Sequence, residues 1–107
     1  MNIGLDFDGT FTADEPLWRN FIGDAQAVGH AVYIVTCRMD TDENREDVLG
    51  LDFGYTPPPS ALVIRTGLPV WKHKFTSGSP KRWFLEQQGI HIDIWIDDMP
   101  KCVEHGR

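Results

Sequence analysis

Short apolar runs rich in β-prone residues alternate with helical segments along most of this chain, and this order is the strongest constraint on its fold. Helices are expected where apolar side chains recur at helical spacing, as in residues 15–28, for which Asp14 is the expected N-cap. Strands separated by helices form parallel sheets, because each helix returns the chain to the same end of the sheet. The sequence therefore predicts an α/β fold, a single-domain three-layer sandwich around a short parallel sheet. About four strands are expected, over residues 3–7, 31–35, 61–64 and 90–96.

Two stretches of the chain carry weaker signals. Asp40 and Glu43 have the spacing of a capping box, so a mostly solvated second helix is expected to begin at Asp40. Residues 67–79 show no clear periodicity, so we expect a loop there with a short extended piece at residues 70–71. A third helix is expected to begin at Ser79, where a serine precedes a proline.

The length and charge of the chain limit what it can do. Its 107 residues are about the size of one domain, so we interpret residues 1–107 as one small core. The net charge of −6 argues against a broad surface for nucleic acid or anionic membrane, so nucleic acid is expected only as a substrate. No apolar run is long enough to span a membrane, and Cys37 and Cys102 are too few for a disulfide framework. We therefore expect a cytoplasmic protein.

Polar residues follow three of the four expected strands. The carboxyl ends of parallel strands lie at one edge of the sheet, which is where ligands bind in such folds. If the first and fourth strands are neighbours, their carboxylates come together, and like charges that close require a compensating cation. A hard divalent ion such as Mg²⁺ prefers oxygen ligands and is the expected cofactor. The residues concerned are Asp6 and Asp8 after the first strand, Thr36 after the second, and Asp97 and Asp98 after the fourth.

Each of these residues taken alone has an ordinary structural explanation, since an aspartate at a strand end is often a turn or cap residue. The run from Asp6 to Thr10 is more specific than that. Residues two apart on an extended chain point the same way, so Asp6 and Asp8 can face one phosphoryl group. Gly9 lets the backbone turn sharply and approach a ligand closely.

At this point the chain resembles the haloacid dehalogenase (HAD) superfamily of phosphohydrolases and phosphotransferases, and the resemblance covers essentially its whole length. The first and fourth motifs of the family are specific in this order, and the second is weak alone. The first is matched by Asp6, Asp8, Gly9 and Thr10, the second by the strand that ends in Thr36, and the fourth by Asp97 and Asp98.

The resemblance implies a mechanism. Asp6 would attack phosphorus and form an aspartyl-phosphate, and Asp8 would protonate the leaving group and then activate water. Mg²⁺ would be held by the Asp6 carboxylate, the Asp8 backbone carbonyl and Asp97, with Asp98 as a ligand or just behind the ligands. Thr36 would donate a hydrogen bond to a phosphoryl oxygen. The carboxylate nucleophile would divide one hard displacement into two easier ones.

The basic residues of the site are less clear from the sequence. The family's third motif is a lysine before the last strand, and Lys81 fits it best because it begins a helix. The alternatives are that Lys81 is a solvated helix residue, or that Lys74 or Lys72 serves the site. Arg38 could bind the substrate phosphate or pair with the acidic helix that follows it.

The chain has no room for a cap domain at either usual position of the family, so the site should be open. An open site suits a phosphorylated substrate that is bulky, such as a nucleic-acid end or a phosphoprotein, or a small phosphate enclosed by a second subunit of a homodimer. Phe11 and Trp71 fall in loops and are expected near the substrate, whereas Trp83 and Phe84 are expected in the core.

Three functions are consistent with this pattern. The first is a Mg²⁺-dependent phosphatase that acts on phosphomonoesters. The second is a catalytically weak HAD-like domain that binds a phosphorylated ligand or a protein partner. The third is a receiver domain, which would need an acceptor aspartate on the third strand, and residues 61–65 contain none.

Overall fold

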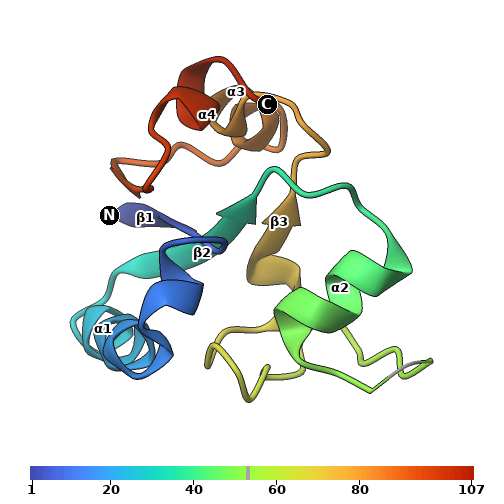
Figure 1. The fold of residues 1–107 in the computed structure, drawn as a ribbon. Helices are drawn as coiled ribbons and strands as arrows, with labels where there is room; N and C mark the ends of the chain where they lie inside the picture. Colours follow the sequence, from blue (N-terminus) through green and yellow to red (C-terminus); the bar gives the residue numbers. More distant parts are fainter. Residues whose placement is uncertain (53) are drawn as a thin grey trace.

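The computed structural model describes residues 1–52 and 54–107 and has a parallel sheet in the order β3-β2-β1-β4. Figure 1 shows α1 and α2 below the sheet and α3 and α4 above it, so the α/β class and the three layers are confirmed. The longest described helix has 13 residues, and none in this part of the chain is long and apolar enough to cross a membrane. The strands are β1 (Asn2–Asp6), β2 (Ala31–Thr36), β3 (His73–Phe75) and β4 (Ile94–Ile96), and the helices are α1 (Glu15–Ala27), α2 (Asp42–Leu49), α3 (Lys81–Gln87) and α4 (Lys101–Glu104).

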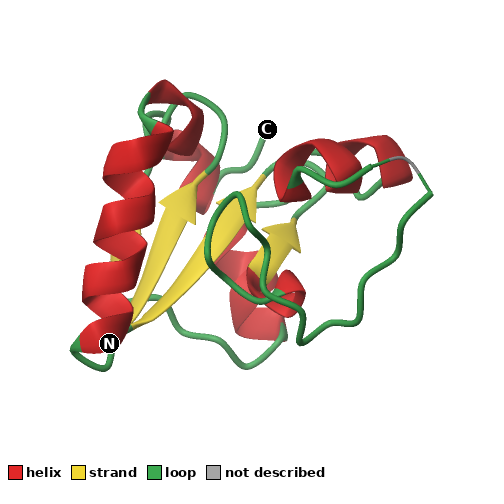
Figure 2. Cartoon of the chain, turned by 90° about the horizontal axis from the view of Figure 1, so that it is seen from below, coloured by secondary structure: helices red, strands yellow, loops and turns green. Residues whose placement is uncertain are grey.

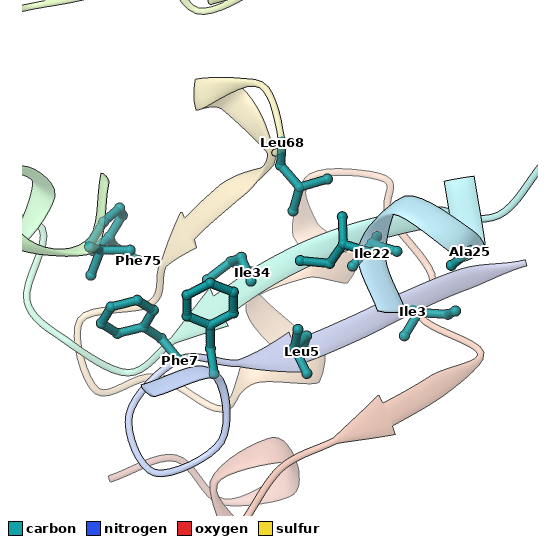
Figure 3. Close-up of a cluster of buried hydrophobic side chains, with 11 residues drawn as sticks. Ile3, Leu5, Phe7, Ile22, Ala25, Ile34, Leu68 and Phe75 are labelled. Carbon is teal, nitrogen blue, oxygen red and sulfur yellow. The ribbon is translucent and has the colours of Figure 1, made fainter. Parts of the chain in front are cut away.

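The larger apolar cluster lies between the sheet and the layer of α1 and α2. Alternate residues of β1, Ile3 and Leu5, point into this cluster together with Ile34 of β2 (Figure 3). The strands run in the same direction, as Figure 2 shows, and nearly all side chains of the two central strands, β1 and β2, are buried on both faces. The other buried members are Phe7, Phe11, Ile22, Ala25, Val32, Val48, Leu68 and Phe75.

The smaller cluster lies on the opposite face, under α3. Tyr33 and Val35 of β2 pack there with Leu85 of α3. Gly4 faces the same layer because it alternates with Ile3 and Leu5 along β1. A Cβ atom at Gly4 would lie 2.7 Å from the indole ring of Trp95, so glycine is required for β1 and β4 to pair closely.

The start of the first helix was predicted correctly and that of the second was not. Asp14 caps α1, since its Oδ1 accepts a hydrogen bond from the amide of Leu17 at 3.3 Å. The cap of α2 is Thr41, whose hydroxyl accepts from the amide of Asn44 at 3.2 Å. Asp40 is instead bound by the guanidinium of Arg45, so its carboxylate makes an ion pair rather than a cap.

The prediction of a strand over residues 61–64 is wrong. This segment forms only an isolated antiparallel bridge between Leu62 and Pro69. The chain reverses immediately after it, because the amide of Gly67 donates to the carbonyl of Val63 at 2.8 Å. Ile64 is 97% exposed, so its β-prone character is not used in any sheet. A tight turn this close left no length of chain to pair with β2.

The third strand of the sheet lies instead in the predicted loop, at His73–Phe75. It pairs with the end of β2, with Thr36 opposite Phe75. The expected extended piece at residues 70–71 is a 3-10 helix, Val70–Lys72. The strand escaped prediction because only one of its three residues is apolar and because it is a short edge strand, whose formation depends on the open edge of β2.

The fourth strand is shorter than predicted, since only Ile94–Ile96 of residues 90–96 pairs with β1. The register places Ile3 opposite Ile94, and β1 begins only one residue before Ile3. Ahead of the strand, the carboxylate of Asp93 accepts a hydrogen bond from the amide of Asn2 at 2.7 Å. The apolar alternation of residues 90–96 therefore begins before the point at which β1 is available as a partner strand.

The aromatic residues differ from expectation at three positions. Phe11 is fully buried and stacks on Phe7 with ring centroids 5.8 Å apart, so it belongs to the core rather than to a substrate surface. Trp71 lies against Tyr33, outside the pocket described below. Trp83 is 55% exposed, whereas its neighbour Phe84 packs on the smaller cluster as expected.

A buried histidine holds β3 to the turn before it. The Nδ1 atom of His73 lies 3.0 Å from the carbonyl oxygen of Pro69, which can only accept, so Nδ1 carries the hydrogen. The hydroxyl of Thr66 then donates to Nε2 at 2.8 Å. Burial lowers the pKa of His73 to about 4, so the ring is neutral in the folded protein at neutral pH.

This histidine should make the fold sensitive to acid. The folded-state pKa of about 4 lies below the ordinary 6.5, so the unfolded chain binds a proton first and stability falls as the pH drops from about 6.5 to 4. We expect the His73→Asn variant to lack this loss. The stability difference between wild type and variant should shrink by roughly 2 to 3 kcal/mol between pH 7.5 and 4.5, measured by urea unfolding. A difference that does not change with pH would contradict the prediction.

Candidate active site

The carboxylates expected to converge do so at the carboxyl end of the sheet. Because β1 and β4 are neighbours, with Leu5 opposite Ile96, the residues that follow them lie side by side. Carboxylate oxygens of Asp6, Asp97 and Asp98 lie within 4.8 Å of one another. They share a pocket of about 40 Å³ with Thr36 from the end of β2, and its other lining residues are Asp8, Cys37, Lys81, Met99, Cys102 and Arg107.

Lys81 is the lysine of this pocket. It is the first residue of α3 and is 2% exposed, so the predicted alternative of a solvated helix lysine is excluded. Its Nζ donates to Asp6 Oδ1 at 2.7 Å and to Asp97 Oδ2 at 2.6 Å. Lys72 and Lys74 do not line the pocket, and the Nζ atoms of both lie within 6 Å of the Trp71 ring, at 5.5 and 5.8 Å.

Burial and close charges shift the pKa values of this ion pair. Burial raises the pKa of Asp6 to about 7, the carboxyl of Asp98 adds to the rise, and Lys81 opposes it. For Lys81, burial alone would lower the pKa, but the hydrogen bonds that its ammonium donates to Asp6 and Asp97 outweigh the effect of burial, and the pKa is raised. Asp6 is thus poised between its two protonation states near neutral pH, and an added cation would favour the ionised form.

Asp8 is placed differently from Asp6, because it is held by an arginine at the mouth of the pocket. The guanidinium of Arg38 donates to both carboxylate oxygens of Asp8, at 2.7 and 2.9 Å, and also pairs with Asp47 of α2. The hydrogen bond from Arg38 keeps the pKa of Asp8 below its ordinary value. Of the two roles considered for Arg38, the structure shows the pairing with the acidic helix and, in addition, with Asp8.

Hydroxyl groups tie the loop after β1 to the loop after β4. The hydroxyl of Thr10 donates to Asp6 Oδ2 at 3.2 Å and accepts from the amide of Asp98 at 3.2 Å. Thr36 is buried, and its hydroxyl oxygen accepts from the amide of Arg38 at 3.2 Å. The hydroxyl hydrogen of Thr36 is therefore available to a ligand in the pocket it lines.

Gly9 allows the two loops to approach. Its φ angle is +82°, which favours glycine, and a Cβ atom there would lie 2.3 Å from Asp98 Oδ2. Gly29 also has a positive φ, +91°, but a Cβ atom there would meet nothing within 4 Å. Both glycines therefore have a backbone conformation that favours glycine, but only Gly9 lacks space for a side chain.

This pair supplies a matched test of the carboxylate arrangement. Gly9→Ala should displace the Asp98 carboxylate and weaken Mg²⁺ binding by about tenfold or more, measured by titration calorimetry. Gly29→Ala carries the same backbone strain of roughly 1 kcal/mol and should bind Mg²⁺ as the wild type does. Equal affinities in the two variants would show that the close approach of Gly9 to Asp98 does not matter for the metal.

The chemistry of the donor set fits a hard divalent cation. Three carboxylates within 4.8 Å of one another present oxygen ligands only, and the pocket contains more acidic than basic side chains. The carboxylate of Asp8 is turned to Arg38 and is not part of this three-carboxylate group. Asp6, Asp97 and Asp98 are therefore the residues that could hold such an ion.

Several residues at the site were not predicted from the sequence. Met99, Cys102 and Arg107 line the pocket and come from the segment after β4. Cys37 is buried and lines the same pocket. Nothing in the local sequence marks the last residues as part of a site, because their position depends on how α4 returns the chain toward the sheet.

No family model, curated protein or solved structure matches this chain. The assignment of fold class accordingly rests on the sheet and its layers, and the resemblance to the HAD superfamily rests on the sequence motifs. The observed third strand, β3, is followed by Thr76 and Ser77, and neither is the acceptor aspartate that a receiver domain would need there.

Proposed function

We propose that this protein is a Mg²⁺-dependent phosphohydrolase that acts on phosphomonoesters through an aspartyl-phosphate. The observation that carries this proposal is the environment of Asp6. One oxygen of its carboxylate accepts from buried Lys81 and the other from Thr10, so the group is fixed in orientation at the wall of a small pocket. A rigidly oriented carboxylate beside a cation suits attack on an anionic phosphorus centre.

The reaction proceeds in two displacements. In the first, a carboxylate oxygen of Asp6 bonds to phosphorus and the bond from phosphorus to the leaving oxygen breaks, which yields an acyl phosphate and an alkoxide or phenoxide that takes a proton from water. In the second, water attacks phosphorus, the bond to Asp6 breaks, and inorganic phosphate leaves. Thr36 and Lys81 donate hydrogen bonds to phosphoryl oxygens as negative charge shifts during each step.

The ion pair between Asp8 and Arg38 suits the second displacement better than the first. An ionised Asp8 can accept a proton from the attacking water in the second displacement. It has no proton to give to a departing alkoxide in the first. The site should therefore favour phosphoesters whose leaving group is stable without a proton, such as aryl phosphates, over alkyl phosphates.

Mg²⁺ is the cofactor that the proposal assigns to the three-carboxylate group, with the Asp8 backbone carbonyl as a further ligand. When bound, it would offset the repulsion between the Asp6 nucleophile and the phosphate. The carboxylates of Asp97 and Asp98 serve to hold it, and Lys81 keeps Asp97 in place. A bound cation also favours the ionised form of Asp6, the form that reacts.

The size of the pocket bears on the substrate. A volume of about 40 Å³ takes a phosphoryl group and leaves the rest of the substrate outside. The substrate is thus recognised mainly through its phosphate, and bulky compounds, including a phosphorylated nucleic-acid end, can reach the site. For a small substrate, we propose that a second subunit of a homodimer covers the open site.

Release of inorganic phosphate tests the proposal directly. The panel should contain an aryl phosphate, an alkyl phosphate, mononucleotides, and oligonucleotides phosphorylated at the 3′ or 5′ end. We expect release that requires Mg²⁺, stops with a chelator, and is fastest for the aryl phosphate. Absence of release from every compound at millimolar Mg²⁺ would contradict the phosphohydrolase assignment.

A second function is favoured by the same ion pairs and must be distinguished. Lys81 and Arg38 already form ion pairs with Asp6, Asp97 and Asp8, as they would in a domain that binds a phosphorylated ligand without turning it over. Such a domain would bind phosphate and Mg²⁺ in calorimetry while releasing no phosphate from any substrate. Binding without turnover therefore supports the second function and excludes the first.

A further inference from the structure

The segment after α4 closes one side of the candidate active site. Figure 1 shows the C-terminus of the chain beside α3, whose first residue is Lys81. The amide of Arg107 donates to the carbonyl of Gly78 at 2.9 Å, and Arg107 lines the pocket that contains Asp6 and Asp8. A residue far from the motifs in sequence is thus part of the pocket wall.

Gly106 is what lets this segment lie so close. It is buried, with a φ of +76°, and a Cβ atom there would be 2.4 Å from the carbonyl oxygen of Gly78 and 2.9 Å from the nitrogen of Pro80. Both neighbours are backbone atoms, which cannot rotate out of the way. The contact therefore fixes the position from which the side chain of Arg107 extends.

The basic side chains at the site differ in whether an acidic side chain already binds them. Lys81 is held by Asp6 and Asp97, and Arg38 by Asp8 and Asp47. Among residues 1–52 and 54–107, the guanidinium of Arg107 makes no hydrogen bond or ion pair with another side chain. The charge of Arg107 is nonetheless felt in the pocket, since it adds to the effect of the Arg38 hydrogen bond in lowering the pKa of Asp8.

A phosphomonoester brings a further dianion to a pocket lined by four aspartates and only two basic residues, Lys81 and Arg107. Arginine binds phosphate oxygens through two parallel hydrogen bonds, which makes it well suited to an exposed position at the mouth of a site. We propose that Arg107 is a substrate-binding residue that binds the phosphoryl group from the pocket wall that the segment after α4 forms, where Gly106 positions it. This inference rests on the proposed function, because it concerns the same pocket.

Binding of inorganic phosphate in the presence of Mg²⁺ tests this assignment without requiring turnover. We expect Arg107→Gln to weaken phosphate binding roughly tenfold to a hundredfold. The affinity of Arg107→Lys for phosphate should lie between that of Arg107→Gln and that of the wild type. Arg19→Gln removes the same charge from the surface of α1 and should bind phosphate normally. In steady-state assays the loss in Arg107→Gln should appear mainly as a raised KM.

A second pair of variants tests the positioning by Gly106 with Arg107 intact. Gly106→Ala should push the segment away from Gly78 and weaken phosphate binding, whereas Gly29→Ala, which has open space, should not. Wild-type affinity in Arg107→Gln, equal affinity in Gly106→Ala and Gly29→Ala, or no phosphate binding by the wild type would each overturn the inference. A wild type that binds phosphate without hydrolysing any ester would refute the proposed function. The phosphate affinities of the Arg107 and Gly106 variants would then still show whether Arg107 binds phosphate.

Discussion

Replacing Asp6 with asparagine should reduce phosphate release by roughly a thousandfold or more, since removal of a covalent nucleophile eliminates the reaction path itself. The amide keeps the size of the side chain. Its oxygen can still accept from Lys81, and its NH2 group can donate to the Thr10 hydroxyl in place of the bond that Thr10 donates to Asp6, so the pocket should keep its shape. Because burial raises the pKa of Asp6 to about 7, the folded protein already tolerates a neutral group here, and stability should change little at neutral pH. Phosphate release and the thermal unfolding midpoint are the two measurements.

The control for this variant is Asp24→Asn, on the exposed surface of α1. It makes the same chemical change and removes the same charge, but it lies outside the residues that line the pocket. It should hydrolyse phosphoesters at the wild-type rate. Turnover in Asp6→Asn that equals turnover in Asp24→Asn would mean that Asp6 is not the nucleophile, even if Mg²⁺ is required.

Replacing Lys81 with methionine should destabilise the fold by about 3 to 5 kcal/mol, the usual cost of removing one partner from a buried ion pair. Asp6 and Asp97 would lose the ammonium that lies 2.7 and 2.6 Å from them. Domains of this size are stable by only about 5 to 15 kcal/mol, so the unfolding midpoint should fall sharply. Urea unfolding is the measurement, and Lys101→Met, at an exposed position of α4, is the control.

Two conditions should relieve the cost of Lys81→Met, because the cost arises from uncompensated carboxylates. Lower pH protonates Asp6, whose pKa is about 7 in the wild type, so the variant should be closest to wild type near pH 5 and furthest from it at alkaline pH. Mg²⁺ should stabilise the variant more than it stabilises the wild type, since it would take the place of the ammonium. A variant as stable as Lys101→Met in the absence of Mg²⁺ would show that Lys81 does not hold the site together.

Much of the site was accessible to prediction from local sequence. An apolar run followed by Asp6, Asp8 and Gly9 predicts a buried strand with two carboxylates and a turn at its end, because strand and turn signals are local. The convergence of Asp97 with Asp6 also followed, once parallel topology placed the ends of the strands at one edge. These inferences needed only periodicity and chain direction.

Other features depended on contacts that no local pattern encodes. Residues 61–64 are more apolar than His73–Phe75, yet the edge of β2 is taken by His73–Phe75. An edge strand forms where a neighbour offers free backbone groups and where its buried side chains find partners, and His73 finds them in Thr66 and Pro69. Both conditions concern residues that meet only in the folded chain.

Local sequence is enough to predict the parallel α/β class, the three layers and the edge of the sheet at which the carboxylates gather, because these follow from the order of apolar runs and the residues after them. The ion pairs of Lys81 with Asp6 and Asp97, the ion pair of Arg38 with Asp8, and the place of Arg107 at the pocket depend on the folded chain. Pairing of charges depends on distances of a few ångströms between distant parts of the chain, and the pairing of β1 with β4 and the return of the chain after α4 set those distances.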